Sequence, residues 1–316
     1  MSEAPATQVP LGLRIERALR RQLYLVCRTL VRGVGLDFVG PLGTGLGELH
    51  YRLGGRARRR IEREVALLLG RRPGEPAVRE LVRSAYRVND AAVLEILKLF
   101  DRAQDLERLR AKVEIRGIER LRDALAAGRG AILLAGHMGN GALLVIDLVA
   151  RGIPVSVVYH QARMMDPGLF SDGMARYGID GIVANEGLRA YGRMLSALRA
   201  NRVVYLMADQ GVGKAREGIA LRFLGKDMWM PAGPAQLARH SKAPVLPVAT
   251  TAVEPRWGFE ILPAVERDEN ATLEADVERL LRVSEGLILE HPQFWSWHHR
   301  RWREYPLAAD AVPPPR

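Results

Sequence analysis

The chain has 316 residues, 48% hydrophobic and 26% charged, a composition typical of a folded globular protein with a substantial core. Every long apolar run is interrupted by Arg, Asp or Gly, which excludes a membrane-crossing segment. The single cysteine, Cys27, excludes an internal disulfide framework. The net charge of +11 favours an anionic partner, whereas 6% aromatic residues argue against RNA binding. Residues 1–10 lack a secretory pattern, so we expect a cytoplasmic location.

Residues 1–110 have helical patterns. Apolar residues recur every three or four positions from Pro76 to Phe100, which predicts a helix packed along one face. Near the N-terminus, arginines alternate with aliphatic residues, and this pattern fits either a basic amphipathic helix in a membrane interface or a surface helix with a solvated basic face. These arginines are Arg14, Arg17, Arg20, Arg21, Arg28 and Arg32.

From residue 111 onward, short apolar runs bounded by Gly or Pro alternate with amphipathic stretches. The predicted strands are 113–117, 131–136, 154–159, 203–208, 244–250 and 258–263, and the predicted helices are 118–127, 142–150, 188–200, 232–241 and 273–289. This alternation predicts an α/β fold with a mixed, mostly parallel central sheet flanked by helices, in which the final strand is antiparallel. We therefore expect a helical region at 1–110, an α/β domain at 111–305 and a disordered tail at 306–316.

The stretch AILLAGHMGNGA, residues 131–142, places His137 where a buried strand turns into a helix. In open α/β sheets ligands gather at such strand ends, and a neutral imidazole there can take a proton from a hydroxyl or amine. The loop glycines and the amides of the following helix offer a site for an oxyanion. The alternatives are a structural role for His137 and a helix-capping role for Asn140.

Two other groups of residues are candidates for a site. Asp209 and Gln210 end an apolar run, where they either bind substrate and order the site or serve as turn residues. The segment from Trp295 to Trp302 is rich in aromatic and basic residues and fits interface anchoring or simple packing. No serine-hydrolase elbow or phosphate-binding P-loop is present, and the spacing of His298 and His299 fits no zinc motif.

Five blocks in order resemble the bacterial lipid A biosynthesis acyltransferase family, the late lauroyl and myristoyl transferases. The blocks are AILLAGHMGNG, YHQARMMDPGLFSDGMARYG, LRANRVVYLMADQG, FLGKDMWMPAGPAQLARHSKAPVLPV and HPQFWSWHHRRWR. The resemblance runs from about Tyr86 to Tyr305. It implies acyl transfer, without cofactor or metal, from an acyl carrier protein or coenzyme A thioester to a hydroxyl or amine of a lipid-like acceptor.

By this resemblance His137 is the general base, and Asp209, which matches a family position at the polar end of the site, is a candidate second catalytic residue. The implied substrate-binding residues are Gly139, Asn140, Arg176, Arg189 and Gln210. The family's apolar N-terminal anchor is here shorter and rich in arginine, which implies peripheral attachment to the inner membrane. The basic surface suits an anionic membrane and an acidic carrier protein, and no nucleic-acid partner is expected.

Two departures from the family motif bear on the chemistry. The acidic residue of the family's H-x4-[DE] block is replaced by Ala142, and a tryptophan of the same block by Gly141. Three explanations remain open. Asp209, or less favourably Asp147, supplies the missing carboxylate, or the acceptor is a better nucleophile that needs less help from a base and enters a wider pocket beside Gly141 and Ala142. In the third, the chain binds an acyl group or its carrier without catalysis. We predict the enzyme, with the catalytically silent relative as the alternative.

Overall fold

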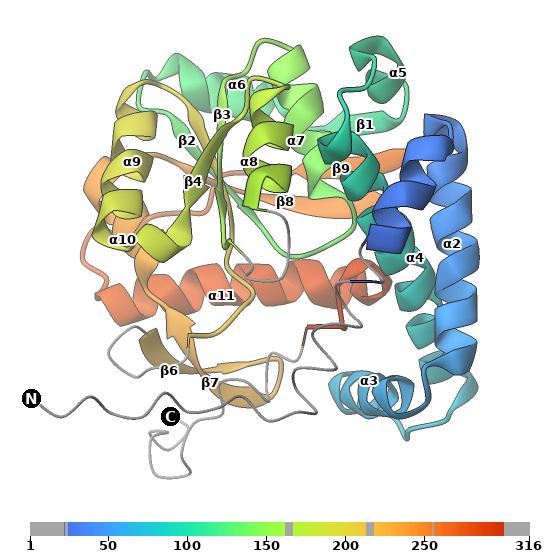
Figure 1. Cartoon of the computed structure of the whole chain (residues 1–316). Coiled ribbons are helices and arrows are strands. Elements are labelled where there is room, and N and C mark those ends of the chain that lie inside the picture. The colour runs from blue at the N-terminus through green and yellow to red at the C-terminus, as the bar shows by residue number, and fades with distance from the viewer. Residues whose placement is uncertain (1–21, 23–24, 162–166, 213–217, 255, 300–316) are drawn as a thin grey trace, which may run out of the picture.

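The computed structural model describes residues 22, 25–161, 167–212, 218–254 and 256–299 (Figure 1). Residues 25–33 are helical, and four helices follow them: α2 Leu36–Leu53, α3 Gly55–Leu68, α4 Pro76–Asp101 and α5 Leu106–Arg110. The predicted helical character of the N-terminal third is therefore confirmed for its described part. The predicted tail at 306–316 lies outside the described residues.

Helices α2 and α4 lie side by side at one edge of the molecule and approach each other closely (Figure 1). A Cβ atom at Gly43 would lie 2.4 Å from the Cα atom of Ala91, and one at Gly47 would lie 2.6 Å from the Cα atom of Arg87. Only residues without a side chain allow such backbone contact. The two glycines therefore fix the spacing of α2 and α4.

The central sheet has seven strands in the order β1-β9-β8-β2-β5-β3-β4. The strands are β1 Val113–Arg116, β2 Ala131–Ala135, β3 Val155–Tyr159, β4 Asp180–Val183, β5 Val203–Met207, β8 Val245–Ala252 and β9 Trp257–Ile261. All neighbouring pairs are parallel except β8 and β9, which confirms the predicted mixed sheet and its antiparallel last strand.

Helices cover both faces of the sheet. They are α6 Ile118–Ala126, α7 Gly141–Ala150, α8 Pro167–Ala175, α9 Leu188–Arg199, α10 Gly233–Ser241 and α11 Leu273–Glu290, with the short 3-10 helices η1 Ala184–Glu186 and η3 Pro292–Phe294. All five residues of β2 are buried, and they alternate between two hydrophobic clusters on opposite faces of the sheet. Helix α4 contributes to both clusters, so the N-terminal helices share the core of the sheet.

The sequence analysis did not predict edge strand β4, helix α8 or a separate hairpin. Strand β4 is only four residues long and contains Gly181, which weakens the strand pattern. The hairpin pairs β6 Gly218–Phe223 with β7 Lys226–Pro231, and its turn places Leu224 and Gly225 at φ 48° and 76°. A leucine in a left-handed turn conformation is not a turn signal that a sequence pattern reveals.

The helical residues 25–33 are held on the end of α4 by an ion-pair cluster. The Nε atom of Arg28 lies 2.6 Å from Asp101 Oδ1, and the Nε atom of Arg32 lies 2.7 Å from Asp101 Oδ2. These hydrogen bonds, foremost that of Arg32, lower the pKa of Asp101 to about 2. Two of the six N-terminal arginines are thus paired within the protein, and the other four lie outside the described residues.

We predict that Asp101→Asn lowers the free energy of unfolding at neutral pH by about 1 kcal/mol, because the shifted pKa favours the folded state and the exposure of Arg32 reduces the effect. A lowered carboxyl pKa stabilises the fold above the ordinary value of 3.8 and ceases to do so as the pH falls toward 2. Urea unfolding should therefore show the two proteins converging at low pH. Asp37→Asn, at an exposed carboxylate paired with Lys112, is the matched control and should cost less. A difference that does not depend on pH would contradict this assignment.

Candidate active site

His137 lies in the loop between β2 and α7, against Asp209, which follows the neighbouring strand β5. Its Nδ1 atom is 2.6 Å from Asp209 Oδ1, and its backbone N–H donates to Asp209 Oδ2 at 3.1 Å. Because β2 and β5 are parallel neighbours, their carboxyl ends meet at one edge of the sheet. The fold thus places a carboxylate beside the imidazole, as the sequence comparison anticipated for Asp209.

The Asp209 carboxylate is fully buried, with 0% of its side chain exposed, whereas 25% of the His137 side chain is exposed. The indole Nε1 of Trp295 also donates to Asp209 Oδ2, at 2.7 Å. A buried carboxylate needs such donors to offset the loss of hydration. Trp295 and Trp297 are each 1% exposed, which favours packing over interface anchoring for these two. Residues 300–302 of the same segment lie outside the described residues.

The contacts of His137 define which nitrogen is available for proton transfer. A nitrogen 2.6 Å from a carboxylate carries the proton and donates it, so Nδ1 is the protonated nitrogen and Nε2 the basic one. The amide Nε2 of Gln210 is 3.4 Å from His137 Nε2 and 3.4 Å from Nδ1 of His299. The rings of His137 and His299 lie 5.0 Å apart. Gln210 is therefore brought to the site, together with His299, which the sequence analysis did not assign to it.

The glycine loop uses its amides within the protein. The N–H of Met138 donates to the carbonyl of Gly136. The N–H of Gly139 donates to the carbonyl of Phe294 in residues 291–299, which we call the closing segment. Gly139 has φ 57°, and a Cβ atom there would lie 2.5 Å from the Trp257 ring, so this position requires glycine. The expected oxyanion contact through the loop amides is thus not available for residues 137–139. Among the described residues, the amides of Gly141 and Ala142 that begin α7 have no hydrogen-bond partner.

Asn140 joins the loop to α4 through a second buried carboxylate, Glu95. Its Oδ1 accepts from Leu143 N, which makes it the N-cap of α7, and its Nδ2 donates to Glu95 at 2.9 Å. Glu95 also accepts from Trp257 Nε1 at 2.6 Å. Burial raises the pKa of Glu95, while these two hydrogen bonds act against the rise. Asn140 is fully buried, and both its Oδ1 and its Nδ2 are engaged in hydrogen bonds within the protein. The capping role therefore replaces the expected substrate contact.

The sequence profile of one family, described as bacterial lipid A biosynthesis acyltransferase, matches residues 12–304. The chain belongs to this family. It is also 32% identical over 207 residues to the phosphatidylinositol mannoside acyltransferases of two strains of Mycobacterium tuberculosis, covering 63% of this chain and 61% of theirs. A protein of the same name from Mycolicibacterium smegmatis is 27% identical over 250 residues, covering 77% of this chain and 78% of its own. The chain thus spans less than two thirds of the Mycobacterium tuberculosis relatives.

At Gly141 the expected wider pocket is filled by a neighbouring side chain. A Cβ atom at Gly141 would lie 2.4 Å from the hydroxyl oxygen of Tyr205, a residue of β5 that is 5% exposed. Tyr205 therefore fills the space that a larger residue at 141 would need. Ala142 is partly buried and packs on the core.

Two family-matched arginines are not brought to His137. Arg176 lies between α8 and β4, at the edge where the parallel strands begin, and its guanidinium donates to the Phe100 carbonyl at 2.6 Å. Arg189 lies on α9, the helix that connects β4 to β5, and 81% of its side chain is exposed. The order of strands separates strand β4, which lies between these two arginines in the chain, from the pair His137 and Asp209, which we call the dyad.

Asp147, the other carboxylate weighed from the sequence, is used elsewhere. It is buried on α7 and pairs with Arg151 one turn further along the helix.

None of the described helices is long and apolar enough to span a membrane.

Proposed function

We propose that this chain is an acyltransferase that moves an acyl group from a thioester to a hydroxyl of a lipid-like acceptor, with His137 as the general base. The observation that carries the proposal is the 2.6 Å contact between His137 Nδ1 and the buried Asp209 carboxylate. It leaves the basic Nε2 of a partly exposed imidazole for the acceptor. Membership of the acyltransferase family supports the reaction class.

In this reaction His137 Nε2 takes the proton of the acceptor hydroxyl as its oxygen bonds to the thioester carbonyl carbon. The imidazolium that forms is stabilised by the Asp209 carboxylate at Nδ1. The tetrahedral intermediate then collapses, the carbon–sulfur bond breaks, and the leaving thiolate takes the proton back from His137 as a thiol. The protein ends in its starting protonation state, and no cofactor is needed for the balance.

The developing oxyanion has a candidate site at the start of α7. The amides of Gly141 and Ala142 belong to the first turn of that helix, where backbone N–H groups carry partial positive charge. Asn140 fixes this turn through its own cap to Leu143. We propose that the helix start, rather than the glycine loop, donates to the oxyanion.

The acceptor we propose is a sugar-bearing anionic phospholipid. Two considerations support it: the similar mycobacterial proteins carry a phosphatidylinositol mannoside in their names, and the net charge of +11 suits a phosphate-containing acceptor. A positive surface also suits an acyl carrier protein or coenzyme A as the donor, because both are anionic.

We further propose that one face of α2 contacts the membrane. This face carries Phe38 and Leu53, which are 70% and 75% exposed, together with the half-exposed Leu49. The three residues fall on one side of the helix at 100° per residue, away from the side that packs on α4. Exposed aliphatic and aromatic residues beside basic ones are typical of helices that lie in a membrane interface.

We predict that His137→Ala and Asp209→Asn each lower kcat by roughly three to four orders of magnitude, because they remove the base and the group that orients it. The assay follows thiol release from acyl carrier protein or coenzyme A thioesters in the presence of a mannosylated phospholipid. Asp147→Asn removes a buried carboxylate from α7 without touching the dyad and should keep kcat within a few fold. Turnover by His137→Ala equal to that of the parent would refute the mechanism. Acyl binding without turnover by the parent would favour the silent relative.

Restoring the family acid with Ala142→Glu should not raise kcat. The Nδ1 atom of His137 already donates to Asp209, so a second carboxylate has no proton to accept there. The same assay measures the effect, and Ala142→Gln, of equal size without charge, separates steric loss from electrostatics. A gain of about tenfold or more with Ala142→Glu would mean that Asp209 does not serve as the orienting group.

Replacing the exposed apolar residues of α2 should weaken membrane binding. We expect the double variant Phe38→Ser/Leu53→Ser to lose about tenfold or more in partition to phosphatidylglycerol-containing vesicles, because it removes two large apolar side chains from the contact. Sedimentation with vesicles measures the partition. Leu188→Ser, at a leucine of α9 that is still more exposed, is the control and should bind as the parent does. Equal loss in both variants would contradict the assignment to α2.

A further inference from the structure

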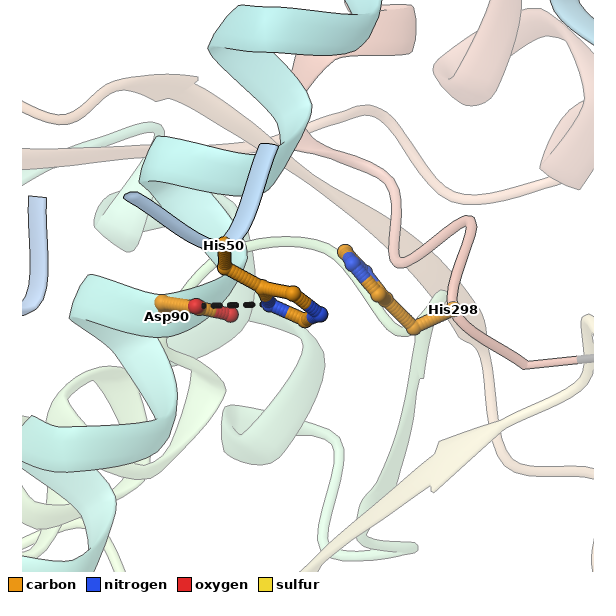
Figure 2. A group of neighbouring side chains, drawn as sticks. All are labelled: His50, Asp90 and His298. Carbon is orange, nitrogen blue, oxygen red and sulfur yellow. Dashed lines mark hydrogen bonds and ion pairs between the residues drawn. The ribbon is translucent and has the colours of Figure 1, made fainter. Parts of the chain in front are cut away.

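Three potential metal ligands meet where α2, α4 and the closing segment come together (Figure 2). They are His50 of α2, Asp90 of α4 and His298, which follows η3. One ligand atom from each residue lies within 4.8 Å of the other two. The Nδ1 atom of His50 is 3.0 Å from Asp90 Oδ2, and the His298 ring points toward the His50 ring, with centroids 5.4 Å apart.

His298 is the member of this cluster whose ring nitrogens lack hydrogen-bond partners among the described residues. Both of these nitrogens are buried. Buried polar atoms without a partner are rare in folded proteins and call for a ligand, an ion or a water. A neutral imidazole is also the form that binds metals.

The surroundings hold the other two ligands in place. Asn89 donates to Asp90 Oδ1 at 3.0 Å, which fixes the carboxylate and leaves Oδ2 turned toward His50. The Tyr86 ring packs edge-on against the rings of both His50 and His298. The nearby positive charge of Arg60 is offset by Glu64, 2.9 Å away. Such outer partners are what orients ligands in metal sites.

We propose that His50, Asp90 and His298 bind a divalent transition-metal ion of the zinc type. Two imidazoles and one carboxylate are ligands that Zn²⁺ prefers, and three protein ligands leave a fourth position for water. Tetrahedral coordination needs ligand atoms about 3.4 Å apart, so small side-chain rotations close the cluster from its present spacing. The ligands come from three separate elements, which is why no spacing in the sequence indicated them.

The bound ion would connect the closing segment to the N-terminal helices beside the dyad. The N–H of Ser296 donates to the His137 carbonyl at 2.8 Å, and the ring of His299, which follows His298 in the chain, lies 5.0 Å from the ring of His137. Fixing His298 to α2 and α4 thus holds the segment that supports the His137 loop. The proposal concerns a structural ion and does not depend on the acyltransferase activity, so binding alone tests it.

The experiment titrates Zn²⁺ into the full chain after removal of metals with a chelator, by isothermal calorimetry and thermal unfolding. We expect one ion per chain and a rise in Tm on addition of zinc. His50→Ala and His298→Ala should each weaken binding at least tenfold and abolish the rise in Tm. Asp90→Asn preserves shape and should weaken binding about tenfold; it decides the question if an alanine variant does not fold, as circular dichroism will show.

Two histidine controls locate the ion. His240→Ala removes a histidine that pairs with Tyr191 on α9 and should leave zinc binding unchanged. His299→Ala removes the neighbour of His298 that faces the dyad and should also leave it unchanged. The proposal is overturned if the parent binds no zinc, or if binding survives in Asp90→Asn and His298→Ala but is lost in His299→Ala, which would place the ion at the His137 pair.

Discussion

The burial of the Asp209 carboxylate determines the arrangement of the candidate active site. A fully buried carboxylate is costly unless donors surround it, and its donors here come from the His137 loop and the closing segment. The backbone and ring of His137 and the indole of Trp295 are thereby drawn to one point at the end of β5. The same hydrogen bonds that compensate the buried charge select the tautomer of the imidazole, so stability and chemistry rest on one interaction.

A second buried carboxylate, Glu95, holds the other end of the same loop. It receives hydrogen bonds from Asn140, which follows the left-handed Gly139, and from Trp257, whose ring occupies the space beside Gly139. The loop is therefore fixed at His137 by Asp209 and at Asn140 by Glu95, and glycine is needed between them because Trp257 occupies the space of a side chain. This double anchoring leaves the His137 ring as the exposed part of an otherwise buried turn.

Much of this arrangement follows from the sequence, and the part that does not has a physical reason. Hydrophobic runs and their spacing indicated six of the seven strands of the main sheet, and parallel neighbouring strands bring the ends of β2 and β5 together. Glu95 was missed because it lies on a helix whose other positions read as core, although a glutamate at a buried position is itself a signal. The hydrogen bonds from the loop amides to the carbonyls of Gly136 and Phe294 depend on backbone geometry, so they cannot be predicted from residue types.

The glycines of α2 have a mechanical consequence. Because Gly43 and Gly47 let the backbones of α2 and α4 touch, no side chain separates the two helices at these two positions. Helix α4 in turn holds Asn140 through Glu95. A displacement of α2 would therefore be transmitted through α4 to the turn that carries the His137 imidazole. The fold thus sets the distance between the exposed face of α2 and the His137 ring.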